Sequence, residues 1–352
     1  MQRQADINLY ARTLAKTLEY LDYPAVVGFE TPFLDHLAED FRAAGFEAER
    51  HRNLVVIELG KPGPVFLAHG DRHGLITTQD GAVYAAGAAA AQRAGDDPAS
   101  SAELVETLDK RHGGEEVFAY DPRTGSRLAY GDIVSVAAGA DGLPRFQLAG
   151  LSGLEPGTPL AFSRHLDRSQ DGYISGQLDN AVSIAALRIA AEFGLGGTII
   201  ITAEERLAGS AAHVLNWAEA GGLAPTRSLI VCDISPFDEG AAGLSGAVIL
   251  RRRDASASFD ADAVAQLESA ANTAGVPVIF KDNFMEHENE ARERRGHPLR
   301  CMGQTELGKI IAQSKGRYTG ATLQIPTFNY DTHRESTTPR AVDAFVRTLL
   351  AL

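Results

Sequence analysis

Six acidic and imidazole side chains stand where strands are expected to end or helices to begin. They are His69, Asp179, Glu204, Glu205, Asp233 and His333. The carboxyl ends of the strands in an open α/β sheet meet at one edge, so we expect these side chains to lie together there. Two imidazoles and four carboxylates suit two divalent cations, with one carboxylate bridging the ions and one left as a general base.

Each of these residues also has a plainer explanation. His69 and His333 could be packed or surface histidines, and Asp179 and Asp233 could cap a helix or shape a turn. Pairs of glutamates are common on solvated surfaces. A metal site is favoured by the joint pattern rather than by any one member. Asp71, two positions after His69, adds a carboxylate that could orient the imidazole.

The elements that must position these groups are short apolar runs. Thr198–Thr202 is β-branched throughout, which is typical of a strand buried on both faces, and the glutamate pair follows it. Two further runs, residues 65–68 and 228–232, end just before His69 and Asp233. Strands that alternate with helices in this way predict a doubly wound α/β fold with a mixed sheet.

Residues 75–170 lack the alternation of strands and helices predicted for the rest of the chain. Several short β-like runs are separated there by Gly, Asp and Pro. We interpret this segment as an inserted, β-rich domain. Residues 1–74 and 171–352 would then form one discontinuous catalytic domain.

The composition excludes several classes of protein. The 352 residues are 44% hydrophobic and 22% charged, as in ordinary globular proteins. The net charge of −13 argues against nucleic acid or an anionic membrane surface as a partner. No apolar run approaches the ~18 residues of a membrane span. The two cysteines do not suggest a disulfide framework, and the first residues lack the apolar core of a signal peptide, so we expect a cytoplasmic protein.

The order His-x-Asp, Asp, Glu-Glu, Asp, His resembles that of the cocatalytic zinc exopeptidases. The 110 positions from His69 to Asp179 resemble one branch, the tetrahedral (TET) aminopeptidases, which include glutamyl aminopeptidases and proteins named endoglucanases. That branch inserts a β-rich dimerisation domain at this point. Residues 24–30 (PAVVGFE), 68–71 (AHGD) and 325–327 (IPT) match the same branch. The resemblance covers nearly the whole chain and is strongest in the ligand segments.

The resemblance implies two divalent metal ions and a role for each ligand. The ions would be zinc, with cobalt or manganese as alternatives. His69 and Asp233 would bind one ion. Glu205 and His333 would bind the other, and Asp179 would bridge them.

The resemblance also implies the catalytic groups and the partners. Glu204 would be the general base and Asp71 would orient His69. The substrate would be a peptide. The chain would self-associate through the inserted domain into a closed shell such as a dodecamer.

Departures from the family lie around the expected substrate pocket. The family has Asp-Asp-Arg where this chain has Asp179-Asn180-Ala181, and Gly-Gly-Thr-Asp where residues 303–306 read GQTE. The charged segment 282–300 looks longer than its counterpart. It could be a solvated surface, or it could line the pocket with arginines, which would favour acidic N-terminal residues, or with glutamates, which would favour basic ones.

The sequence therefore predicts a dinuclear metal-dependent aminopeptidase that removes N-terminal residues from peptides. Two alternatives stay open. One is a metal-dependent hydrolase of acylated amino acids or another small amide, and the other is a non-catalytic assembly protein that retains the fold. A glycan substrate is less consistent, because glycosidases typically use two carboxylates without metals.

Overall fold

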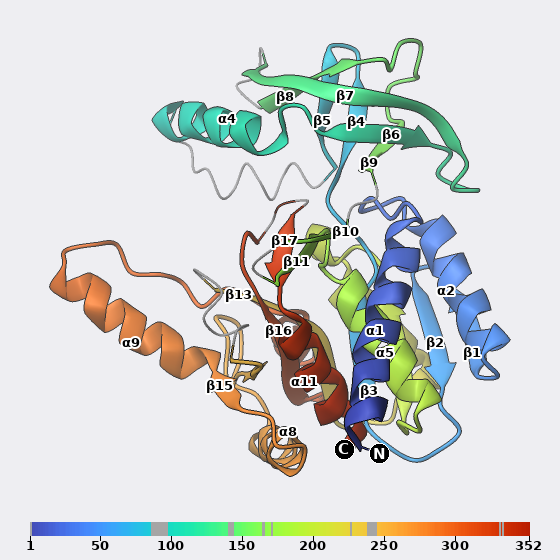
Figure 1. Cartoon of the computed structure of the whole chain (residues 1–352), viewed down its shortest axis with the longest axis vertical. Helices are drawn as coiled ribbons and strands as arrows, with labels where there is room; N and C mark the ends of the chain where they lie inside the picture. Colours follow the sequence, from blue (N-terminus) through green and yellow to red (C-terminus); the bar gives the residue numbers. More distant parts are fainter. Residues whose placement is uncertain are drawn as a thin grey trace.

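The computed structural model describes residues 2–85, 98–139, 144–163, 166–169, 172–225, 227–237, 245–330, 332 and 334–352. Its centre is a mixed sheet (Figure 1). The strands, in spatial order, are β1 (Glu47–His51), β2 (Leu54–Glu58), β12 (Thr198–Thr202), β3 (Val65–His69), β13 (Leu229–Pro236), β16 (Gly320–Thr327), β14 (Val248–Leu250) and β15 (Val278–Phe280). The predicted mixed α/β sheet is confirmed.

The four middle strands are parallel to one another, so their carboxyl ends share one edge. β2 and β14 join this group in antiparallel orientation. β3 and β13 pair only as far as Leu67 and Val231. Their ladder therefore ends two residues before His69 and Asp233, which leaves room between the strand ends.

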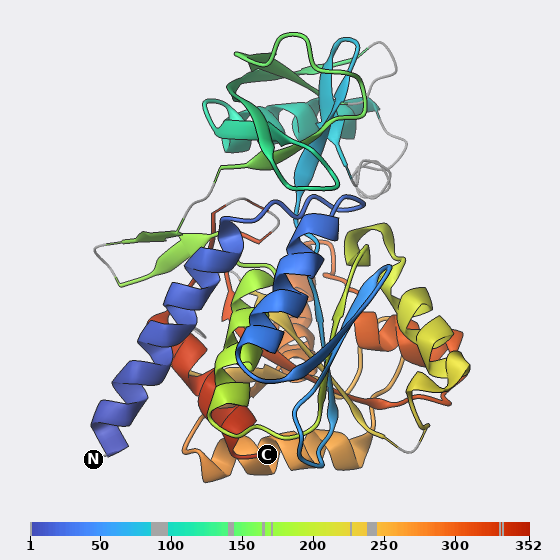
Figure 2. The same ribbon diagram turned by 90° about the vertical axis from the view of Figure 1, so that its right-hand side faces the viewer.

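Helices cover both faces of the sheet. They are α1 (Gln2–Leu21), α2 (Thr31–Ala43), α5 (Ala181–Glu192), α6 (Ser210–Trp217), α8 (Ala261–Thr273), α9 (Lys281–Arg294), α10 (Glu306–Gln313) and α11 (Pro339–Leu350). α5 and α11 lie on one face with α1 packed against them, and α6 and α10 lie on the other (Figure 2). α5 is apolar on nearly every side, as expected for a helix between a sheet and other helices.

Short elements complete this part of the chain. A 3₁₀ turn, η1 (Glu205–Leu207), follows β12, and a π turn, η2 (Ala218–Gly222), follows α6. A small sheet joins β10 (Leu166–Arg168), β11 (Ile174–Gly176) and β17 (Glu335–Thr337). Among the described residues, every helix is too short or too polar to cross a lipid bilayer.

A closed β-barrel lies between β3 and β10 in the sequence and stands apart from the main sheet (Figure 1). Its strands are β4 (Gly74–Thr78), β5 (Gly81–Tyr84), β8 (Pro144–Ala149), β7 (Arg127–Ala138), β6 (Glu116–Tyr120) and β9 (Pro159–Phe162). α4 (Pro98–His112) packs against β7. Leu75, Ile133, Phe146 and Leu160 belong to a hydrophobic core separate from that of the sheet.

Candidate metal centre

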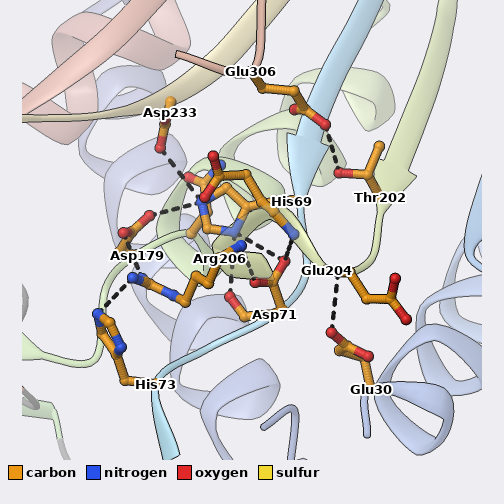
Figure 3. Close-up of polar contacts among 12 residues, drawn as sticks. Glu30, His69, Asp71, His73, Asp179, Thr202, Glu204, Arg206, Asp233 and Glu306 are labelled. Atoms are coloured by element: carbon orange, nitrogen blue, oxygen red, sulfur yellow. Dashed lines mark hydrogen bonds and ion pairs between the residues drawn. The ribbon is translucent and has the colours of Figure 1, made fainter. Parts of the chain in front are cut away.

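Three of the predicted ligands meet where β3 and β13 separate (Figure 3). One donor atom from each of His69, Asp179 and Asp233 lies within 4.8 Å of the other two. The His69 Nε2 atom is 2.9 Å from the Asp179 Oδ1 atom and 3.7 Å from the Asp233 Oδ1 atom. His69 ends β3, Asp233 lies in β13, and Asp179 lies in the loop that opens α5.

Each charged group of this cluster shifts the pKa of its neighbours. Burial lowers the pKa of the His69 imidazole, but the carboxylates around it, Asp179 first, outweigh burial and hold that pKa well above its usual range. Burial raises the pKa of the Asp233 carboxyl, and the charges of Asp179 and Glu205 raise it further. A buried imidazole nitrogen beside two carboxylates that repel each other fits one divalent ion.

Asp71 holds two parts of the centre together. The His69 Nδ1 atom lies 3.2 Å from the Asp71 backbone oxygen, an arrangement that leaves Nε2 free to bind a metal. The Asp71 carboxylate accepts the backbone N–H groups of Glu205 and Arg206 at 2.9 and 3.0 Å. Burial raises the pKa of this carboxyl, but His69 and Arg206 bring it below its usual range.

The two glutamates after β12 point in different directions. Glu204 has a left-handed backbone with φ of 61°. Its carboxylate binds the His213 Nε2 atom at 2.8 Å and points away from His69 (Figure 3). Glu205 instead lies close enough to Asp233 to raise the pKa of that carboxyl, and its Oε1 atom accepts a hydrogen bond from the Lys309 Nζ atom at 2.7 Å.

The sequence reasoning missed two cations at the centre. The Arg206 Nη2 atom donates to the Asp179 Oδ2 atom at 2.6 Å, and both side chains are buried. Lys309 lies in α10 and binds Glu205. The basic residue directly after the glutamate pair was the available signal for Arg206. His333 lies outside the described residues, so its role as a ligand stays a prediction.

A cavity of about 640 Å³ lies at the carboxyl end of β13. Its lining includes Pro236 and Phe237, which follow Asp233 along the chain. Five cationic side chains line it, those of Arg111, Arg251, Lys281, Arg300 and Arg334. Arg111 comes from α4 beside the barrel, and the others come from the sheet side. The arginines first singled out in the charged segment, Arg292, Arg294 and Arg295, are not among the lining residues.

Arg251 is a deeply buried cation of this cavity, with 5% of its surface exposed, the same fraction as Lys281. Its guanidinium donates to neutral oxygens, those of Gln324 at 2.7 Å, Met302 at 3.1 Å and Ser235 at 3.4 Å. Burial lowers its pKa, although carboxylates at some distance, Asp233 first, raise it. A buried cation held by neutral partners at a cavity wall is suited to an anionic ligand.

Comparison with solved structures identifies the fold. The TET1 peptidase of Pyrococcus horikoshii, described as assembling into a tetrahedron or a large octahedral shell, aligns with a TM-score of 0.69 at 16% identity over 96% of this chain and 98% of that one. An aminopeptidase from Desulfurococcus kamchatkensis aligns with a TM-score of 0.69 at 13% identity, over 97% and 94%. An endoglucanase from Thermotoga maritima aligns with a TM-score of 0.61 at 11% identity, over 96% of each chain.

No protein-family model and no curated protein sequence matches the chain. The structural matches extend over nearly the full length of each chain, barrel included. The chain therefore has the fold of the TET peptidases.

Proposed function

We propose that this protein is a metal-dependent aminopeptidase that hydrolyses the N-terminal peptide bond of its substrate. The observation that carries this proposal is the cluster of His69 and Asp179, both buried, with the half-buried Asp233 at the carboxyl edge of the parallel strands. Ligands of open α/β sheets bind at such an edge. The same fold occurs in proteins named as aminopeptidases.

The cluster would hold a divalent ion, with zinc as the first candidate and cobalt or manganese as alternatives. Such an ion polarises a carbonyl group and lowers the pKa of a bound water molecule. Asp71 keeps the His69 ring oriented so that Nε2 faces Asp179. Two ions, as the sequence predicts, would also require Glu205 and His333.

A glutamate of the pair would act as general base. It takes a proton from the attacking water as the water oxygen bonds to the carbonyl carbon, and it passes that proton to the leaving amine as the C–N bond breaks. Glu204, the residue predicted from the sequence, would have to release His213 and turn towards the cluster. The backbone N–H of Glu205 donates to Asp71 beside His69, and its charge raises the pKa of Asp233, so we assign the role to Glu205.

The cavity at the carboxyl end of β13 suits an acidic side chain at the substrate's N-terminus. A carboxylate there would meet Arg251, whose hydrogen-bond partners are neutral, and the other cations of the lining. Charge-assisted hydrogen bonds between a guanidinium and a carboxylate are among the strong ones in proteins. We therefore propose glutamyl and aspartyl peptides as the preferred substrates.

A panel of aminoacyl chromogenic substrates tests this function. The protein is stripped with a chelator and assayed with zinc, cobalt or manganese against glutamyl, leucyl and lysyl compounds. We expect activity only with metal, highest on the glutamyl substrate. Full activity after chelation, or no activity with any metal and substrate, would contradict the proposal. His69→Ala serves as the inactive control.

The same cavity favours one alternative substrate. Its cations would also bind the carboxylate of an acylated amino acid, whose amide bond would then lie near the cluster. N-acetylglutamate distinguishes the two, since it has no free amine. Release of acetate from it at a higher kcat/KM than release of the chromophore from the glutamyl substrate would favour the acylase.

We also propose that the protein self-associates through residues 75–170, as a dimer that builds into a dodecamer. Three apolar side chains, Leu128, Tyr130 and Val134, are exposed along the outer face of β7. Side chains two residues apart on a strand share a face, so they form a stripe on the barrel that is apolar apart from the exposed Asp132 between Tyr130 and Val134. The P. horikoshii protein of the same fold assembles into closed shells.

Light scattering tests the stripe. The double variant Leu128→Asp and Val134→Asp should have a smaller mass in solution than the unmodified protein. Leu299→Asp removes an equally exposed apolar residue outside the barrel and should leave the mass unchanged. An unchanged mass in the double variant would exclude this surface as the interface.

A further inference from the structure

We infer that the centre holds one metal ion, and that the side chains of Arg206 and Lys309 supply the positive charge that a second ion would bring. This inference rests on the proposed metal-dependent function and refines its site. It contradicts the two ions implied by the family resemblance. The ion pairs of Asp179 and Glu205 carry the argument.

Asp179 is the residue expected to bridge two ions, which requires one carboxylate oxygen for each. Its Oδ1 atom faces the His69 Nε2 atom at 2.9 Å, on the side of the three-residue cluster. Its Oδ2 atom accepts a hydrogen bond from the Arg206 Nη2 atom at 2.6 Å. The oxygen that would bind the second ion is therefore already bound to a guanidinium.

Arg206 is built into this position. Its side chain is 6% exposed, and its backbone N–H donates to the Asp71 carboxylate. Its Nη1 atom also contacts the His73 ring. A guanidinium keeps its charge at all physiological pH values and has no lone pair to offer a metal. It therefore repels a second cation and cannot become its ligand.

Glu205, the other described residue of the expected second-ion set, is also paired with a cation. The Lys309 Nζ atom donates to the Glu205 Oε1 atom at 2.7 Å, and both side chains are mostly buried. Lys309 lies on α10, on the opposite side of the sheet from α5, and Arg206 lies in η1. Two separate elements, η1 and α10, thus each place one cation where the second ion would bind.

The two cations also reduce the negative charge available to a second ion. Asp71, Asp179, Glu205 and Asp233 bring four carboxylates to the centre, and the buried Glu335 adds a fifth, which accepts the backbone N–H of Asp179 at 2.8 Å. Arg206 and Lys309 offset two of these five negative charges. One divalent ion would offset two more, whereas a second would leave a net positive charge beside a buried guanidinium. Adding positive charge to such a buried site is costly, so the residues present fit one ion better than two.

Metal content tests this directly. The full-length protein is stripped with a chelator, loaded with excess zinc and passed through a desalting column before elemental analysis. We expect one zinc per chain. Two zinc ions per chain would overturn the inference and leave the aminopeptidase proposal standing. No bound zinc, together with no activity, would overturn both.

A double variant tests the role of the cations. Arg206→Gln and Lys309→Met remove both charges while keeping similar side-chain lengths, and we expect this protein to bind a second zinc. The control is Arg317→Gln and Lys110→Met, which breaks two exposed ion pairs and should leave one zinc per chain. One zinc in the Arg206 and Lys309 variant would overturn the assignment of these residues.

Manganese spectroscopy tests the unmodified protein even if the variant does not fold. Protein loaded with excess Mn²⁺ and then desalted should give the electron paramagnetic resonance signal of an isolated ion. A signal from two coupled ions would overturn the inference.

Discussion

Asp71 accepts a hydrogen bond from the backbone N–H of Glu205 at 2.9 Å and thereby ties the end of β3 to the turn that follows β12. The Asp71 side chain is fully buried. The Asp71 Oδ1 atom lies 3.5 Å from the His69 Nδ1 atom, whereas the Asp71 backbone oxygen lies 3.2 Å from the same nitrogen. The carboxylate therefore positions the glutamate turn at least as much as it orients the imidazole.

Asp71→Asn should weaken metal binding. The substitution removes a buried negative charge next to His69, and it places an NH₂ group where the oxygens now accept two backbone N–H groups. We expect metal affinity to fall by about 10- to 100-fold, as for other changes behind a ligating histidine. Competition with a chelating dye measures this affinity. Asp262→Asn, an exposed change on α8, is the control, and an equal loss there would contradict the specific role of Asp71.

Glutamine substitutions distinguish the two glutamates. Glu205→Gln should lower kcat by roughly 10²- to 10⁴-fold, the usual contribution of a general base, while the metal ion stays bound. Glu204→Gln should change kcat much less, because its carboxylate is held by His213 and points away from the cluster (Figure 3). The sequence alone predicts the reverse. A large loss of kcat in Glu204→Gln with normal metal content would restore Glu204 as the base.

The sheet could be predicted from local patterns. Thr198–Thr202 is fully buried, as its β-branched composition predicts, and it pairs in parallel with β3. In that register Thr202 lies opposite His69, so the glutamates must follow close to the histidine. A short run of apolar, β-branched residues predicts a buried parallel strand well, because few other positions in a fold bury both faces of a strand.

The orientations within the site could not be predicted in this way. Glu204 turns away because its backbone is left-handed and its N–H donates to Glu30, which is 174 positions away in the sequence. The Lys309–Glu205 pair joins residues 104 positions apart. Adjacency in sequence indicates which turn a residue occupies, but long-range hydrogen bonds decide which way its side chain points.

Charge reversal in the cavity should change substrate preference. Arg300→Glu replaces a cation of the lining, and we expect the ratio of kcat/KM for glutamyl over lysyl substrates to fall at least tenfold, which corresponds to about 1.4 kcal/mol. The matched control is Arg294→Glu with Arg295→Glu, because both side chains are exposed and neither lines the cavity. A larger shift in the control than in Arg300→Glu would show that the charged segment, rather than the cavity, selects the substrate.

Glu306 should make the stability of the metal-free protein depend on pH. Burial raises the pKa of its carboxyl from 4.5 to about 7. Between these values the folded chain holds a proton that the unfolded chain has lost. The free energy of unfolding therefore falls as pH rises through this window, by about 3 kcal/mol for this group. The contribution is fully present below pH 4.5 and lost above about 7.

Glu306→Gln should remove this component of the pH dependence, because the amide stays neutral and can still accept the hydrogen bond that Thr202 donates at 2.9 Å. Urea unfolding between pH 5 and 8 measures it, since the midpoint shifts with the free energy of unfolding. The variant should lose less stability over this range than the unmodified protein, whereas Glu47→Gln, at an exposed position on β1, should behave like the unmodified protein. An equal loss of stability in Glu306→Gln and in the unmodified protein would contradict this prediction. It would mean that Glu306 is already ionised in the folded chain at pH 5, and that other charges compensate for its burial at the start of α10, beside β12.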